Sequence, residues 1–287
     1  MASESSLCSL AVKGQARWRG FLVSPLTAAI SAVHSLTVLG VNVMKIIDDL
    51  IESEHSHLDA DQFAGVQFTG FATSWQAVAR YHTFLTIIVE REAKATEVFS
   101  LSSKAFRDTP PSPGPYLTAE QERRLDELDE ATDLLHLEIE SFYLFAKILL
   151  DVVARAIEKY FGLGRACSLD SHHDLIDNFA EYAAQKKLDP TDFIEKAKQL
   201  RADISNFRDH EIAHSKRLNR VTGTALTADR RRATMIAAST VVPPERFKPE
   251  ASSIHVGELM SAVENYIASA IEIVKTNRDK TNLTFTS

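Results

Sequence analysis

The sequence contains few of the residues that build disulfide frameworks or turn-rich folds. Its two cysteines, Cys8 and Cys167, are too few for a disulfide framework or a cysteine-based zinc site. Ten glycines and nine prolines supply too few turn residues for an all-β chain. The sequence has no Gly-rich phosphate loop, no G-x-S-x-G motif and no internal repeat. These absences favour a helical protein in a reducing compartment, for which we expect the cytoplasm.

The chain also lacks an excess of positive charge. Its 39 acidic and 32 basic residues give a formal net charge of -7, which argues against a protein coated in positive charge for nonspecific nucleic-acid binding. A local basic patch still allows RNA to bind. Hydrophobic residues make up 45% of the 287 residues, so a sizeable core is expected. We therefore expect a globular, all-α protein.

One uncharged segment, Gly20 to Met44, follows three basic residues in the manner of a signal sequence or a membrane span. Pro25, His34, Asn42 and five Ser or Thr residues dilute it, whereas a spanning helix needs about 20 predominantly apolar residues. We interpret the segment as a buried helix of a soluble domain. Neither membrane insertion nor export is expected.

Proline and glycine divide the chain into two helical parts. The segment RDTPPSPGPY, Arg107 to Tyr116, holds four of the nine prolines and indicates a stiff linker or a long turn. We expect residues 1–105 to form an N-terminal helical region, residues 106–117 a Pro-rich linker and residues 118–287 a helical domain.

Two stretches of the N-terminal region have helical character. Residues 41–52 form the first, and the stretch from Gly65 to Gly70 is expected to interrupt the chain before a long helix from Ser74 to about Ser103. His82 lies on the apolar stripe of that long helix. We interpret it as a histidine whose polar atoms are satisfied within the packed core.

The C-terminal part begins with a capping box, Thr118 to Gln121, which predicts the start of a long helix. The seam of that helix alternates steps of three and four residues: Leu125, Leu128, Thr132, Leu135, Ile139, Phe142, Ala146, Leu149, Val153, Ala156 and Tyr160. Five more residues widen its apolar face: Leu134, Leu137, Phe145, Ile148 and Val152. This width favours packing against several helices.

Three more helices are expected after the long one. The first runs from about His172 to Lys187, with His172 and His173 exposed at its start, and the second starts with Asp189 as N-cap and Pro190 as first helical residue. The last runs from about Ser253 to Lys275.

The segment FRDHEIAHSK, residues 207–216, places polar residues on the core-facing stripe of the second of these helices, which costs free energy unless pairing or function explains it. From His210 it spells H-E-x-x-H, in which His210 and His214 are able to bind one zinc ion while the glutamate polarises a water. The flanks are charged, however, and Arg217 and Arg220 occupy the glycine and third-histidine positions of the extended motif. A zinc hydrolase is therefore the third hypothesis.

From Arg208 the same segment spells R-D-x-x-x-x-H, which suits cleavage of RNA. The guanidinium of Arg208 stabilises charge on phosphorus, and His214 exchanges a proton with the 2′-OH or the leaving 5′ oxygen, without metal or other cofactor. On one straight helix the two residues lie about 120° around and about 9 Å along the axis from each other, so they do not converge. Two helices that cross at a twofold axis bring them together, which predicts a homodimer.

This spacing resembles the R-x(4-6)-H motif of the HEPN superfamily, in which Asn, Asp or His commonly follows the arginine. The ending I-A-H-S, Ile212 to Ser215, is especially similar to the abortive-infection branch of that superfamily. The stretch from Ile139 to Gly162 resembles the first long helix of these domains. The resemblance covers about residues 118–275 and leaves the first 105 residues unexplained.

The resemblance implies an all-α, HEPN-like antiparallel helical bundle that dimerises and acts as a metal-independent endoribonuclease in toxin or anti-phage systems. Arg208 and His214 match the catalytic pair of the motif, and Asp209 matches its polar position. Such a role also implies an antitoxin or regulatory partner. One departure is Lys216, because several active members have a tyrosine there.

Positive charge is concentrated directly after the motif, and Lys216, Arg217 and Arg220 are expected to bind RNA. The alternative is a non-catalytic dimeric module that binds RNA or protein. In that case Arg208 pairs with Glu211, and the two histidines line a polar seam between helices.

Overall fold

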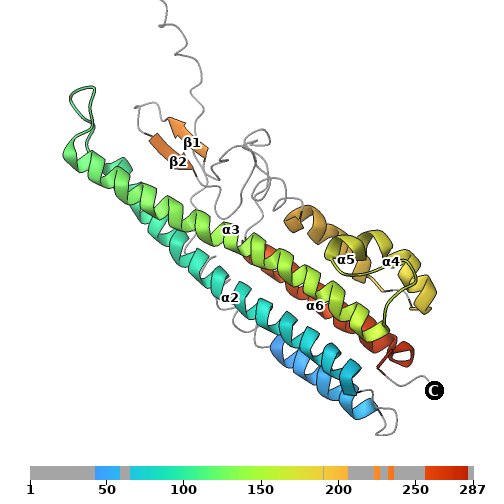
Figure 1. The fold of residues 1–287 in the computed structure, drawn as a ribbon. Coiled ribbons are helices and arrows are strands. Elements are labelled where there is room, and N and C mark those ends of the chain that lie inside the picture. The colour runs from blue at the N-terminus through green and yellow to red at the C-terminus, as the bar shows by residue number, and fades with distance from the viewer. Residues whose placement is uncertain are drawn as a thin grey trace, which may run out of the picture.

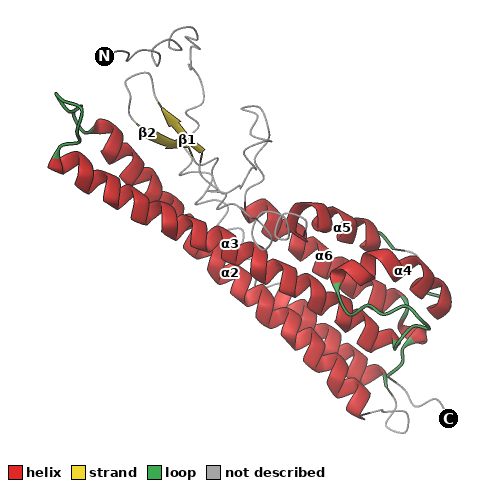
Figure 2. Ribbon diagram, turned by 45° about the horizontal axis from the view of Figure 1, so that its top comes forward, coloured by secondary structure: helices red, strands yellow, loops and turns green. Residues whose placement is uncertain are grey.

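The computed structural model describes residues 43–58, 65–189, 191–205, 223–226, 232–235 and 256–283. Helices account for most of them, which confirms the expected all-α class (Figures 1 and 2). The helices are residues 43–57, α2 (Gly65–Asp108), α3 (Ala119–Phe161), α4 (His172–Lys186), α5 (Phe193–Leu200), η1 (Arg201–Ser205), α6 (Val256–Thr276) and η4 (Arg278–Lys280). Strands β1 (Gly223–Leu226) and β2 (Arg232–Met235) pair antiparallel and form the one sheet in this part of the chain.

The helices α2 and α3 form a long antiparallel hairpin along which the other helices pack (Figure 1). Helix α6 contacts both of them, and α4, α5 and η1 lie on the α3 and α6 side. The end of the hairpin that carries the loop between α2 and α3 extends past α6. Other helices therefore pack along one side of the hairpin.

The Pro-rich segment is the loop that joins α2 to α3. Both helices nevertheless contribute to one hydrophobic core, which includes Trp75 and Leu85 of α2, Phe142 of α3 and Val263 of α6. The turn comprises residues 109–118, because α2 continues to Asp108, and the two helices that it joins pack against each other.

Helix α2 starts earlier than predicted. The expected interruption from Gly65 to Gly70 is wrong, because the helix begins at Gly65 and continues through Gly70. The aromatic rings of Phe68 and Phe71 lie 5.9 Å apart, and that of Phe71 lies 5.2 Å from the ring of Tyr160 on α3. This tertiary packing outweighs the low helix propensity of glycine.

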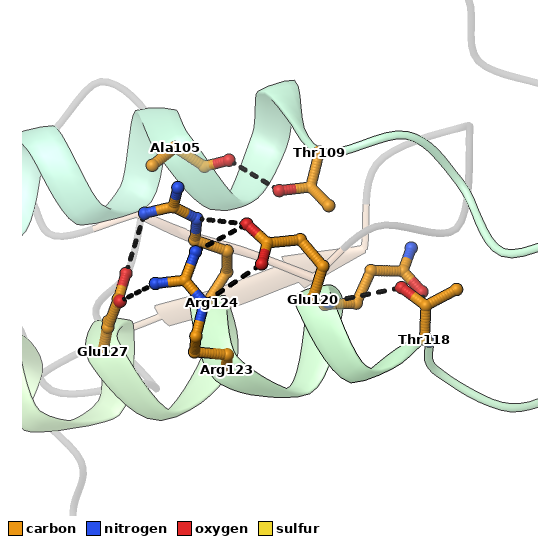
Figure 3. Close-up of polar contacts among 8 residues, drawn as sticks. Ala105, Thr109, Thr118, Glu120, Arg123, Arg124 and Glu127 are labelled. Carbon is orange, nitrogen blue, oxygen red and sulfur yellow. Dashed lines mark hydrogen bonds and ion pairs between the residues drawn. The ribbon is translucent and has the colours of Figure 1, made fainter.

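The capping box at the start of α3 is confirmed. Thr118 Oγ1 accepts a hydrogen bond from the Gln121 N–H at 3.2 Å, and Gln121 Oε1 accepts one from the Thr118 N–H at 2.9 Å. Figure 3 shows the ion pairs of the next turns, formed by four residues of α3: Glu120, Arg123, Arg124 and Glu127. Facing them, the hydroxyl of Thr109 donates to the carbonyl oxygen of Ala105 at the end of α2.

The predicted seam of α3 is largely the core face. Its members are buried from Leu128 to Tyr160, apart from the half-buried Thr132. The widening of that face is wrong in part, because Leu134, Leu137 and Ile148 are exposed.

The helix of residues 43–57 is tied to both α3 and the C-terminal end. Glu54 is 1% exposed, and its carboxylate accepts hydrogen bonds from the Tyr160 hydroxyl and from Arg278 Nε, each at 2.7 Å. Burial and the nearby carboxylate of Glu54 raise the pKa of Tyr160. Helical residues of the N-terminal region therefore form part of the same bundle.

Helix α5 starts at Phe193, not at Pro190 as the Asp189-Pro190 signal predicted. Asp189 serves another contact, because its N–H donates to Asn277 Oδ1 and its carboxylate pairs with Lys280 at 2.8 Å.

Among the described residues, no helix is both long and apolar enough to cross a membrane. The uncharged segment from Gly20 to Met44 lies outside these residues except for its last two positions.

Candidate functional site

The residues predicted from the motif lie outside the described part of the chain. They are Arg208, Asp209, His210, Glu211, His214, Lys216, Arg217 and Arg220. The structure describes the helix that leads to them, in which α5 passes directly into η1, and η1 ends at Ser205, three residues before Arg208. We call α5 and η1 the approach helix, and the structure describes the groups that surround it.

The approach helix is a π-helix over its last five residues, Arg201–Ser205. Its predicted core stripe is confirmed as far as Ile204, since Phe193, Ala197, Leu200 and Ile204 are buried. Ser205 is buried as well, because the wider π turn brings two consecutive residues to the core. η1 thus departs from the straight α-helix that the sequence predicted for this segment. π-helices are rare and occur frequently at functional sites.

Two buried and three half-buried polar side chains gather where η1 meets α3, α4 and α6. We call them the His172 cluster, and its members are Lys147, Asp151, His172, Arg201 and Tyr266. Asp151 Oδ1 accepts hydrogen bonds from the ammonium of Lys147 at 2.6 Å and from the N–H of His172 at 2.8 Å. The ring of His172 meets that of Tyr266 edge-on at 5.7 Å.

The expectation that His172 is exposed is wrong, whereas His173 is exposed as expected. The side chain of His172 is 0% exposed. Asp151 of the preceding helix, α3, accepts a hydrogen bond from the backbone N–H of His172 and so holds the start of α4 against the core. The ring of Tyr266 covers it from α6. Asp151 thus binds the start of α4 as well as Lys147.

Several polar atoms near η1 have no hydrogen-bond partner within the described residues. They are both ring nitrogens of His172, the hydroxyl of Tyr266 and the Oγ of Ser205. A buried polar atom without a partner costs about 1–3 kcal/mol, so such atoms are uncommon in folded proteins. These atoms gather beside the approach to the motif, although Trp75 and Glu264 elsewhere in the bundle also hold such an atom.

Burial determines the protonation of this cluster. Burial, and then the positive charges of Lys147 and Arg201, lower the pKa of His172 to about 3. Burial and the carboxylate of Asp151 raise the pKa of Tyr266 well above its usual value. Both side chains are thus neutral at physiological pH, so His172 is not a proton-exchanging group in that range.

The pKa of His172 predicts an acid-sensitive fold. The folded pKa of about 3 lies below the ordinary value of 6.5, so between these two values the unfolded chain binds the additional proton. Above pH 6.5 His172 is neutral in both states, so its burial costs no stability. As the pH falls from 6.5 towards 3, the unfolded chain gains the proton first, and the free energy of unfolding falls by about 2 kcal/mol between pH 6.5 and pH 5. Urea unfolding at both pH values measures it.

The matched variants are His172→Phe, which removes the buried ring that titrates, and His173→Gln, which alters its exposed neighbour. The first is expected to lose about 2 kcal/mol of the pH dependence and the second to keep it. Equal pH dependence in the wild type and in His172→Phe would contradict this assignment.

Two other acids of α3 differ in their burial. Glu138 is buried and accepts a hydrogen bond from Arg91 of α2 at 2.6 Å, while Glu140 is only half-buried. The described residues contain no group of three or more His, Cys, Asp or Glu side chains arranged to hold an ion. The histidines of the H-E-x-x-H segment lie outside these residues.

Sequence patterns missed the His172 cluster. Tyr266 lies on the apolar stripe of the last helix, and this position predicts an ordinary core residue. The Ser171 cap marks the start of α4 but gives no sign that Asp151 binds there. Only the long-range contact reveals the cluster.

Comparison of the chain with protein-family models, with curated proteins and with solved structures found no match. The resemblance to the HEPN superfamily therefore rests on the residues of the chain itself.

Proposed function

We propose that the protein is a metal-independent endoribonuclease of toxin or anti-phage type that acts as a homodimer in the cytoplasm. The observation that carries the proposal is the R-D-x-x-x-x-H segment from Arg208 to His214. Its context supports it, because the approach to the motif is a helix of an all-α bundle. This helix ends in a π-helix beside a polar cluster that holds buried atoms without a hydrogen-bond partner among the described residues. The buried, unpaired Cys167 suits a reducing compartment.

In the proposed reaction, the 2′-oxygen of a ribose attacks the adjacent phosphorus. The bond to the 5′ oxygen breaks, so the products are a 2′,3′-cyclic phosphate and a 5′-hydroxyl. His214 of one chain moves the proton, and Arg208 of the other chain stabilises the charge on the pentavalent phosphorus, with Asp209 beside it. Lys216, Arg217 and Arg220 bind neighbouring phosphates. His172 is excluded from the proton transfer, because its pKa of about 3 keeps it neutral.

The test is incubation of the full-length protein with total RNA in the presence of EDTA. Cleavage that persists with the chelator and leaves 5′-hydroxyl ends is the expected result. Loss of cleavage with EDTA, and its recovery with zinc, would favour instead the hydrolase that uses His210 and His214.

A non-catalytic dimeric module is the second candidate. Lys216 favours it, because this position holds a tyrosine in several active members of the family that the motif resembles. A stable dimer that binds RNA or a regulatory partner, but does not cleave any RNA offered, would support this candidate.

A further inference from the structure

The ring of His172 is buried without an acceptor for the N–H groups that it would carry when protonated. Its side chain is 0% exposed, and neither ring nitrogen has a hydrogen-bond partner among the described residues. Asp151 binds the backbone N–H of His172 and the ammonium of Lys147, and not the ring. An imidazolium carries two N–H donors, so protonation in place would leave both of them buried and unsatisfied.

The charges that face the ring of His172 also oppose its protonation. Burial lowers its pKa first, and the charges of Lys147 on α3, Arg201 on η1 and His173 on α4 lower it further, to about 3. Tyr266 faces the ring from α6 with a hydroxyl that is neutral at physiological pH. The carboxylates beside the ring on α3 and α4 already have partners: Asp151 binds Lys147, Asp174 binds Ser171 and Asp177 binds Arg201. An imidazolium at this position therefore has no counter-charge to bind.

Aromatic contacts around His172 join α4 to α5 and α6. The ring of His172 meets that of Tyr266 edge-on at 5.7 Å, and the ring of Phe193 stacks on Tyr266 at 5.2 Å. Phe193 is the first residue of α5, and its ring lies 5.5 Å from that of Phe179 on α4. If the ring of His172 leaves the core, α4 loses this contact with α6, and the contact with Phe179 transmits the change to α5.

Helix α4 lies at the outside of the bundle (Figures 1 and 2). It packs on α3 and α5, and its core face consists of four buried side chains: His172, Leu175, Phe179 and Tyr182. Helix α3, by contrast, buries side chains from Gln121 to Phe161. An element with few buried contacts opens at a lower free energy than the core of the bundle. We therefore expect α4 to open before the α2–α3 hairpin.

We propose that α4 and the approach helix form an acid-labile unit, which opens from the α2–α3 hairpin when His172 is protonated. Protonation favours the open state, because water there reaches the ring and supplies the acceptors that the closed state lacks. The approach helix ends at Ser205, three residues before Arg208, so acid loosens the approach to the motif. Only this last consequence rests on the proposed function, since the opening itself does not depend on catalysis.

The test is hydrogen exchange of the full chain, followed by mass spectrometry at pH 7 and pH 5. After correction for the intrinsic exchange rate, the opening constant of α4 is expected to rise roughly 25-fold at pH 5. This factor follows from a pKa of about 3 in the closed state and 6.5 in the open state. Peptides from α4 and α5 should exchange before those from the centre of the hairpin, residues 75–89 and 139–157, at both pH values.

The matched variants are His172→Phe and His173→Gln. The first removes the buried ring that titrates and should abolish the rise in exchange at pH 5, whereas the second alters an exposed neighbour and should keep it. Lys147→Met provides an independent check if His172→Phe does not fold. It removes one of the charges that oppose the imidazolium, so its rise should be smaller than that of the wild type.

Three results would overturn the proposal: no rise at pH 5 in the wild type, an equal rise in His172→Phe, or exchange in α4 that is as slow as in the hairpin. Acid-induced opening of α4 in a protein that cleaves no RNA leaves the acid-labile unit in place and contradicts only the proposed activity.

Discussion

Arg208→Ala and His214→Ala are each expected to lower the rate of RNA cleavage by about 10²–10⁴-fold in the presence of EDTA. Removal of the histidine abolishes proton transfer, and removal of the guanidinium leaves the transition-state charge without its principal stabiliser. His210→Ala is expected to change the rate by less than about tenfold, because that side chain has no role in the reaction. Initial rates on a defined RNA measure all three effects.

The conservative variant Arg208→Lys separates charge from geometry. Lysine keeps the positive charge but cannot form the bidentate hydrogen bonds of arginine to phosphate, so most of the cleavage rate should still be lost. Lys216→Ala should instead weaken binding and reduce its salt dependence. If His210→Ala proves more damaging than Arg208→Ala, the zinc mechanism replaces the present one.

His82→Leu is expected to lower the free energy of unfolding by about 3–5 kcal/mol. His82 of α2 and Glu264 of α6 are 1% and 7% exposed, and His82 Nε2 lies 3.1 Å from Glu264 Oε1. The other carboxylate oxygen of Glu264 has no partner among the described residues. Removal of the histidine therefore leaves a buried acid without its one hydrogen bond. Urea unfolding followed by circular dichroism measures the loss.

The control for this pair is the double variant His82→Leu/Glu264→Leu. Replacement of both partners by apolar side chains removes the uncompensated group, so most of the lost stability should return. The exposed pair of Glu195 and Lys198 gives the contrast, since Lys198→Ala should cost less than about 1 kcal/mol. A loss below about 1 kcal/mol for His82→Leu would show that the buried pair does not join α2 to α6 as described.

The elements that the sequence predicted correctly depend on local signals. The capping box at Thr118 sets the start of α3, and its seam persists to Tyr160 because one face of the helix packs on α2 and α6. The last helix, predicted from Ser253 to Lys275, is observed as Val256–Thr276. Caps and a sustained repeat involve residues a few positions apart, and these are visible in a sequence.

The sequence predictions are wrong where contacts between residues distant in sequence determine the structure. The aromatic contacts of Phe68 and Phe71 carry α2 through a glycine that local propensity disfavours. His172 is buried by Asp151 and Tyr266, neither of which is near it in the sequence. Periodicity also leaves open which of two apolar seams faces the core, and for that reason Leu134 and Leu137 were assigned to the wrong side of α3.

The candidate site is harder to predict from the sequence than the fold. Spacing alone identified Arg208 and His214, and the geometry of a straight helix required a second chain to bring them together. The structure shows a π-helix at Arg201–Ser205, directly before the motif, where the sequence predicted a straight α-helix. The structure adds the His172 cluster beside α5 and η1, which no local sequence pattern predicts.

The most direct test of the composite site is subunit mixing. Arg208→Ala and His214→Ala chains are each inactive alone, but a mixed dimer contains one site with both residues intact. Co-refolding equal amounts of the two variants should therefore restore about a quarter of the wild-type rate, because about half of the dimers are mixed and each has one of two sites. Mixed dimers, confirmed by differently sized tags, that show no recovery would contradict a site shared between two chains.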